Sequence, residues 1–280
     1  MTLQQVCSYN YDSVLFTASF FLFAYLLYLV YEKEKINKLD IVLVTLSSII
    51  IATIKFVYLP ILGLGLLIPH EKFTLKHGKI LVILMLVVLS LGSYLVVMKC
   101  NSLFWNVHES NTSSLIDYNT YTVSQVIQHP LREIVIIIAT FQRFTADYIS
   151  QMISGPLGWL EMNVPALQLS GFLMMLFYSL FSVEKKSKMD RNVKICSGVF
   201  SMMMILIVIL ALQISWTPDN SLIVVGVQGR YFLPILPMIL LAMKDLLTVK
   251  AENTNIILFY GNIILHISEI FAILCIVIGR

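Results

Sequence analysis

Long runs of apolar residues, separated by short polar segments, make up most of this chain. A helix that spans a membrane needs about 20 consecutive apolar residues. The runs that predict such helices are Val14–Tyr31, Lys79–Met98, Ala166–Ser182, Ile195–Ser215, Tyr231–Leu247 and Ile256–Gly279. Together with one broken run, the pattern predicts an all-α fold, a polytopic transmembrane helix bundle of about 7–8 spans.

The broken run lies between the first two long ones. Ile41–Ile54 and Tyr58–Ile68 are each short for a span, and Lys55 and Pro60 separate them. They are either one span followed by a short return helix or a broken pair of helices. Non-helical backbone at membrane depth occurs only where it is buried in protein or lines a cavity. The break is therefore a candidate functional position.

The positive residues fall into clusters that predict the orientation of the bundle. Lys and Arg mark cytoplasmic loops, and four connections are rich in them. These connections contain Lys33, Lys35 and Lys38; Lys72, Lys76 and Lys79; Lys185, Lys186, Lys188, Arg191 and Lys194; and Lys244 and Lys250. Placing all four inside puts residues 1–13, 55–60, 99–165 and 216–230 on the outer face.

The segment Leu131–Ser154 is also long enough to cross the membrane. A crossing there would put the lysine-rich loop 183–194 outside, against the rule that basic loops stay inside. We therefore expect Leu131–Ser154 to be an interfacial or re-entrant helix on the outer face. It belongs to an outer-face loop and helical segment, 99–165, within a single integral membrane domain, 1–280.

Composition agrees with a membrane location. Hydrophobic residues make up 58% of the 280 residues and charged residues only 12%, whereas soluble domains carry about 25% charged residues. The net charge of +3 is too small to predict a nucleic-acid partner, and membrane lipid is the expected one. The sequence shows no nucleotide-binding loop, no Gly-rich dinucleotide turn and no His-Glu-x-x-His motif. It identifies no cofactor. A divalent metal stays an open alternative, which no spacing of ligand residues in the sequence supports.

Arg230 stands at the mouth of a predicted span, after Gly226 and Gly229 and before Pro234 and Pro237. An arginine at mid-bilayer costs about 2.5–3.5 kcal/mol on insertion scales, and less near the interface. A phosphate would compensate this charge, because arginine binds phosphate through two parallel hydrogen bonds. The alternative is that Arg230 only anchors the span by snorkelling to the interface.

Lys55 is a second cation on the predicted outer face, and it interrupts a span far from the basic loops. With Arg230, Gln228 and Tyr231 it is predicted to hold a lipid phosphate or diphosphate, the lysine acting as a point charge. An interfacial snorkel is the plain alternative for Lys55 as well.

Aromatic residues and carboxylates complete the predicted outer site. Tyr58 and Trp159 are predicted to contact a substrate or the interface, since aromatic rings suit the headgroup level and stack on sugars. Asp12 and Glu161 are the candidate catalytic bases. Asp12 also fits a helix N-cap, and simple solvation is the alternative for Glu161.

His266 and Glu269 lie three residues apart within the last predicted span, and therefore on one helical face. Ionisable groups inside a membrane are functional candidates by default. The alternative is a hydrogen-bonded pair that faces the interior of the bundle.

Three segments resemble a known family. They are Lys55-Phe56-Val57-Tyr58-Leu59-Pro60 running on to Pro69-His70-Glu71-Lys72-Phe73, Gly158-Trp159-Leu160, and Gly226-Val227-Gln228-Gly229-Arg230-Tyr231-Phe232-Leu233-Pro234-Ile235-Leu236-Pro237. With Gln4-Gln5 and Ser8-Tyr9-Asn10-Tyr11-Asp12 at the start, they resemble a bacterial polytopic membrane family of unknown function that is related to the GT-C glycosyltransferases. The last segment, Gly-x-Gln-Gly-Arg-Tyr-Phe-x-Pro-x-x-Pro, is the most specific. The resemblance covers nearly the whole chain.

The resemblance implies a membrane glycosyltransferase-like protein with a GT-C-like fold in the bacterial cytoplasmic membrane. It would use a polyprenyl-phosphate-linked sugar and a glycan acceptor on the extracytoplasmic face, in cell-envelope polysaccharide or wall-glycan assembly. Family members carry further spans and an acidic outer loop before the segment with which this chain begins. We therefore expect the chain to be the C-terminal part of a longer architecture, inactive alone. The alternatives are a transporter or flippase for a lipid-linked glycan and a non-catalytic subunit of a glycan-assembly complex.

Overall fold

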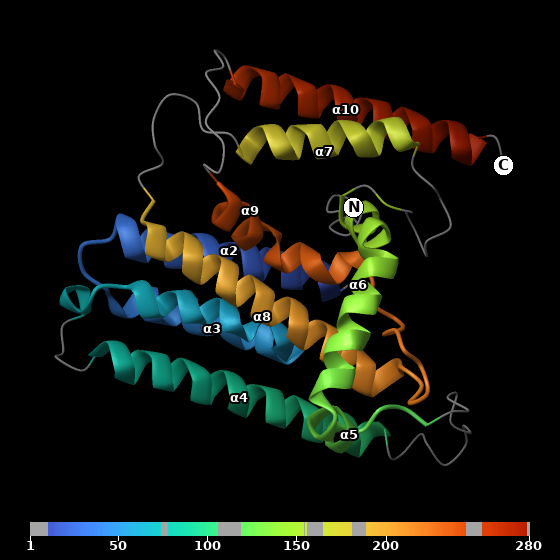
Figure 1. Ribbon diagram of the computed structural model, residues 1–280. Helices are drawn as coiled ribbons and strands as arrows, with labels where there is room; N and C mark the ends of the chain where they lie inside the picture. Colours follow the sequence, from blue (N-terminus) through green and yellow to red (C-terminus); the bar gives the residue numbers. More distant parts are fainter. Residues whose placement is uncertain are drawn as a thin grey trace.

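The computed structural model describes residues 11–73, 78–105, 119–153, 155, 165–180, 189–244 and 254–278. Every named element within these ranges is a helix (Figure 1), which confirms the all-α prediction for the described part of the chain. Five helical runs there are long and apolar enough to cross a membrane. Two more are apolar but shorter, Ala166–Leu180 and Gly229–Met243. The total number of crossings stays a prediction.

Four long helices form a bundle and lie roughly along one direction in Figure 1. They are α2 (Tyr11–Tyr31), α3 (Lys38–Lys55), α4 (Gly78–Trp105) and α8 (Arg191–Trp216). Their positions match the predicted apolar runs to within a few residues at most ends. Helices α2, α3 and α8 each bury several apolar residues, whereas Leu86 is the one large apolar side chain that the described part of α4 buries, and all four leave large apolar side chains exposed. A helix that is apolar all round is typical of a buried or membrane-spanning one.

The broken run is a return hairpin. The backbone of Lys55 is extended, and a 3₁₀ helix, η1 (Phe56–Leu67), runs back from it along α3. A 3₁₀ helix has three residues per turn. Accordingly Tyr58, Ile61 and Leu64 share one face and are almost completely buried. Of the two alternatives for the broken run, the structure therefore has the helix followed by a short return helix.

The segment predicted to lie on the outer face contains α5 (Val123–Gln128) and α6 (Pro130–Ile153). Figure 1 shows α6 running across the bundle helices at one of their ends rather than along them. Near the start of α6, Gln213 of α8 donates a hydrogen bond of 2.6 Å to the buried Glu133. Further along, the backbone N–H of Val224 donates to Thr140 at 2.9 Å. The arrangement agrees with an interfacial helix, whose depth in a membrane stays a prediction.

A second, smaller unit is formed by two helices that lie before and after α8 in the chain. Helix α7 (Ala166–Leu180) lies beside α10 (Thr254–Ile278), and Figure 1 shows this pair set apart from the bundle. Between α8 and α10 come the short η4 (Gly229–Ile235) and α9 (Leu236–Met243), which pack against α8 and α2.

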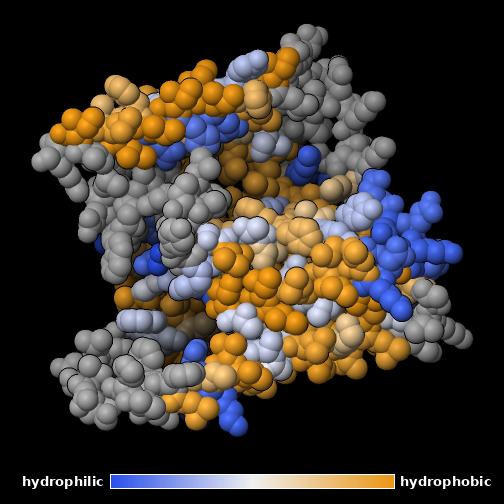
Figure 2. Space-filling view, turned by 180° about the vertical axis from the view of Figure 1, so that it is seen from behind, coloured by the Kyte–Doolittle hydropathy of each residue, from blue (hydrophilic) through white to orange (hydrophobic). Residues whose placement is uncertain are grey.

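The basic connections that the structure describes meet at one end of the bundle. Lys72 donates to the carbonyl oxygen of Val30 at 2.7 Å, and Lys194 donates to that of Lys244 at 3.3 Å. Figure 2 shows hydrophilic residues gathered at one end and apolar residues over much of the sides. We call the end of the bundle at which Lys72 and Lys194 lie the basic end. The positive-inside rule would place it in the cytoplasm.

Candidate functional site

At the end of the bundle opposite to the basic end, three charged side chains from three elements meet. Asp12 lies in the first turn of α2, Lys55 is the last residue of α3, and Arg230 lies in η4. The Lys55 Nζ atom donates to the Asp12 Oδ1 atom at 2.8 Å. The Arg230 Nη1 atom lies 4.0 Å from the Asp12 Oδ2 atom. We call these three residues the charge cluster.

The chain positions each member of the cluster for a local reason. Asp12 belongs to the first turn of a helix, where the N-terminal end of the helix dipole favours a negative charge. Lys55 lies where α3 ends and the chain reverses, so its side chain lies at the tip of the hairpin. Arg230 follows directly on a glycine that α6 holds.

That glycine is Gly229, whose N–H donates to the Gln151 Oε1 atom at 2.8 Å. A Cβ atom at Gly229 would overlap the carbonyl oxygen of Tyr148 and crowd the backbone nitrogen of Met152. Only glycine permits so close an approach of two backbones. Burial raises the pKa of the Tyr148 hydroxyl to about 12, so this neighbour stays neutral.

Tyrosine rings surround the cations. The Lys55 Nζ atom lies 4.5 Å from the centre of the Tyr231 ring and 5.4 Å from that of Tyr11. The Arg230 guanidinium lies 5.6 Å from the Tyr231 ring centre. Such cation–π contacts contribute about 0.5–1 kcal/mol at exposed sites and more where water is excluded. They help to hold two positive charges close together.

Tyr58, which is predicted to contact a substrate or the interface, lies beneath the cluster, and that contact stays a prediction. Its ring is buried, and its hydroxyl donates to the backbone carbonyl oxygen of Tyr231 at 2.7 Å. It therefore ties η1 to η4 and fixes the distance between Lys55 and Arg230. Gln228 sits just before η4, where its carbonyl oxygen accepts the Tyr231 N–H at 3.0 Å.

The charges of the cluster do not cancel. Among the residues that the structure describes, one carboxylate faces two cations, which leaves one positive charge in excess within the cluster. The Asp12 side chain is 2% exposed, whereas those of Lys55 and Arg230 are 21% and 29% exposed. Among the described residues, the buried Arg230 Nε atom has no hydrogen-bond partner. Buried donors without an acceptor are unfavourable, so the arrangement suits an anionic oxygen group.

Sequence reasoning found several members of this site but not their pairing. It singled out Asp12 as a base, Lys55 and Arg230 as phosphate ligands, and Tyr231 beside them. It missed Gln151, because a single glutamine on an amphipathic helix carries no distinctive signal. Two further candidates, Trp159 and Glu161, lie outside the described residues.

His266 and Glu269 lie away from the charge cluster, in the α7–α10 pair. The His266 Nδ1 atom is 3.5 Å from the Glu269 Oε2 atom, and the His266 ring lies 4.9 Å from that of Phe172 on α7. Nearby, Gln168 of α7 donates to Ser268 of α10 at 3.1 Å. Polar contacts of this kind stabilise helix pairs in membranes. The His266 side chain is 43% exposed, and the bundle-facing alternative for this pair stays a prediction.

Two other features bear on ligands. Within the described ranges, no group of three or more His, Cys, Asp or Glu residues is placed to hold a metal ion.

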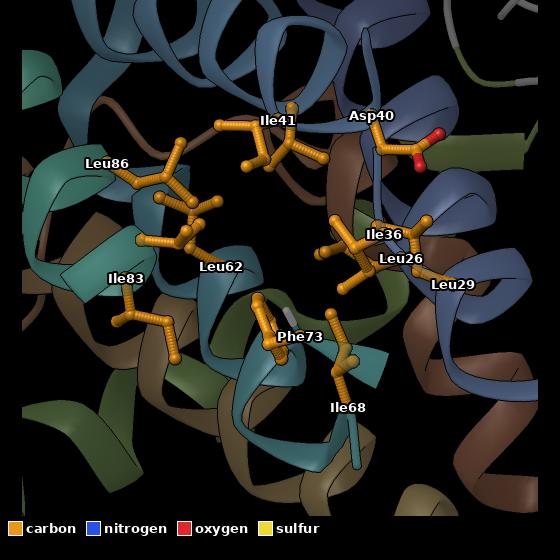
Figure 3. Close-up of a pocket in the computed structure, with 13 residues that line it drawn as sticks. Leu26, Leu29, Ile36, Asp40, Ile41, Leu62, Ile68, Phe73, Ile83 and Leu86 are labelled. Atoms are coloured by element: carbon orange, nitrogen blue, oxygen red, sulfur yellow. The ribbon is translucent and has the colours of Figure 1, made fainter. Parts of the chain in front are cut away.

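Figure 3 shows a small apolar pocket at the basic end, between α2, α3, η1 and α4. The one charged residue that lines it is Asp40. Its carboxylate accepts hydrogen bonds from the Tyr25 hydroxyl at 2.6 Å and from the backbone N–H of Asn37 at 2.7 Å. With a volume of about 30 Å³, this pocket has room for little more than a water molecule.

The helical fold, the apolar sides and the two polar ends define an integral membrane protein. Residues 1–239 match the family described as "Predicted membrane protein (DUF2142)", and the chain belongs to this family. The matched region includes the whole charge cluster and ends in α9. Comparisons with curated proteins and with solved structures gave no match.

Proposed function

We propose that this protein is a GT-C-like, glycosyltransferase-related protein of cell-envelope glycan assembly that binds a polyprenyl-phosphate-linked sugar. The charge cluster is the lipid-phosphate site, on the extracytoplasmic face of the bacterial cytoplasmic membrane. The observation that carries the proposal is the excess positive charge: Lys55 and Arg230 converge on one buried carboxylate. A phosphate diester or monoester supplies the missing negative charge.

The two cations would act differently. Arg230 can present two parallel N–H groups to a phosphate, whereas Lys55 contributes a point charge. In a transfer from a lipid phosphate, negative charge develops on the departing phosphate oxygen, and fixed cations beside that oxygen lower the barrier. The same pair therefore serves both binding and departure of the lipid phosphate.

Asp12 fits the role of counter-ion better than that of a base. It accepts a hydrogen bond from Lys55, so its carboxylate is already engaged by a cation. Deprotonation of an acceptor hydroxyl needs a carboxylate within hydrogen-bond reach. Of the two predicted bases, Glu161 remains for that task.

The engaged state of Asp12 also favours a second candidate function, a non-catalytic subunit that holds the lipid-linked sugar for a partner enzyme. Both candidates use the same phosphate site, and Glu161→Gln separates them. Loss of glycan transfer with intact lipid binding supports a transferase; unchanged transfer supports the subunit. The convergence of the polar groups at one end supports either function over a transport path across the bilayer.

The first test is Arg230→Ala in the producing cell. We expect loss of the glycan modification while the protein still inserts into the membrane at its normal level. Arg143→Ala is the matched control, because Arg143 is an exposed cation on α6 that takes no part in the cluster. A wild-type glycan profile in the Arg230→Ala strain would refute the proposal.

A further inference from the structure

A cavity of about 300 Å³ lies between the α7–α10 pair and the end of α6 with η4 and α9. Its walls are mainly apolar and include Met152, Phe172, Met175, Leu176, Leu233 and Leu236. The polar groups at its edge are turned to their own helices. Asn262 donates to the carbonyl oxygen of Leu258 at 2.7 Å, and Ser179 donates to that of Leu176 at 2.6 Å.

The cavity and the charge cluster share the element η4, which contributes Leu233 to the cavity and Arg230 to the cluster. Leu233 follows Arg230 by three residues in the 3₁₀ helix η4, so both lie on the same face about 6 Å apart along the axis. Phe16 follows Asp12 by four residues on α2, again on the same face. Phe16 and Leu233 are buried in one cluster, and Met152 and Leu236 pack against this cluster. One apolar wall thus leads from the two cations to the cavity.

The surroundings of the cavity are apolar as well. Only 6% of the spanning part of α10 is buried inside the structure, and the exposed surface of this helix is almost entirely hydrophobic. An apolar hollow of this size stays dry or takes an apolar ligand, because water finds too few polar partners there. A hydrocarbon chain entering between helices of this kind leaves one apolar environment for another.

We propose that this cavity holds the hydrocarbon chain of the lipid whose phosphate sits on Lys55 and Arg230. The head-group part of this inference rests on the proposed function, whereas the chain part rests on the cavity alone. The ligand is therefore an amphipathic anion with a long apolar chain, and a short-chain phosphate would bind more weakly. The α7–α10 pair acts as the outer wall of the chain site.

The test uses the purified full chain in nanodiscs and two photoactivatable probes, hexadecyl phosphate and hexadecanol, each with a diazirine near the end of its chain. Met175→Phe and Ser179→Leu narrow the cavity. Met174→Phe is the matched control, because the neighbouring Met174 is 72% exposed. Saturable labelling by both probes is expected to fall about tenfold in the narrowed variants and to stay unchanged in the control. Binding of inorganic phosphate should remain at the wild-type level in all three variants, which also shows that they are folded.

The outcomes separate this inference from the proposed function. Wild-type labelling of both narrowed variants by both probes would overturn the chain site, whatever the phosphate result. If labelling by hexadecanol is lost in the narrowed variants and kept in Arg230→Ala, the chain site is supported independently of the head group. If inorganic phosphate binds neither the wild type nor Arg230→Ala, the phosphate site fails while the hexadecanol result still decides the chain site.

Discussion

The Asp12 carboxylate is the residue on which the charge cluster depends. It is buried and lies within 4.0 Å of both cations, so it lowers the repulsion between Lys55 and Arg230. Removing one partner of a buried ion pair leaves the other charge without compensation, which is strongly unfavourable. At the same time, Asp12 competes with any phosphate for those cations. Its two effects, on stability and on binding, should therefore have opposite signs.

We predict that Asp12→Asn lowers the free energy of unfolding by about 3 kcal/mol. The same change should tighten the binding of inorganic phosphate by about tenfold, because it removes a negative charge beside the ligand. Thermal unfolding in detergent and phosphate titration measure the two effects. The double variant Asp12→Asn with Lys55→Met should recover stability but lose the tighter phosphate binding, because one of the two cations is gone. Unchanged phosphate affinity in Asp12→Asn would contradict the counter-ion role.

A substitution at Gly229 tests whether α6 must lie close to the backbone beside Arg230. In Gly229→Ala the new methyl group would overlap the backbone of α6 at Tyr148, and such crowding costs about 1–3 kcal/mol. We expect a lower unfolding temperature and phosphate binding weakened by about tenfold, since Arg230 is displaced. Gly65→Ala, in η1, is the control, because its Cβ atom would meet only Leu26 at an ordinary 3.9 Å. Equal behaviour of the two variants would argue against the close contact.

At the scale of elements, the sequence pattern predicted most helices but not their detailed form. The apolar run Ile195–Ser215 became α8, and the interruption at Lys55 became the tip of a hairpin. The 3₁₀ geometry of η1 was not predictable from local propensity. It depends on packing against α8, where the Phe200 ring occupies the space that a Cβ atom at Gly63 would take.

This packing leads to a prediction about η1 and α8. Gly63→Val should destabilise the protein by about 2–3 kcal/mol, because the added side chain meets the Phe200 ring. Phe200→Ala alone should also destabilise it, by leaving a cavity. The two changes exchange volume across one contact, so the double variant should be more stable than the sum of the single effects implies. Additive unfolding free energies would show that η1 and α8 do not share this contact.

At the scale of the whole molecule, the placement of Lys and Arg along the chain predicted which loops would lie together. The contacts within the charge cluster could be found only from the structure. The basic residues that the structure describes share one end, as Lys72 and Lys194 show, because a rule about loop charge does not depend on how helices pack. The contact of Asp12 with Lys55 joins residues 43 positions apart. It arises from the packing of α2 on α3 and η1, and no local sequence pattern predicts this packing. The sequence could therefore propose the members of the cluster and leave their partners open.

The final prediction concerns the direction in which the bundle spans the membrane. Single cysteines at Glu34, near the basic end, and at Val225, near the charge cluster, occupy exposed positions at opposite ends. In a background where the natural cysteines are replaced by serine or alanine, a membrane-impermeant maleimide should label Val225→Cys in intact cells. Glu34→Cys should react only after permeabilisation, because the positive-inside rule puts its loop in the cytoplasm. Arg143→Cys on α6 should follow Val225→Cys if α6 lies on the outer surface. The reverse labelling pattern would put Lys55 and Arg230 on the cytoplasmic side, where an extracytoplasmic lipid-linked sugar could not reach them.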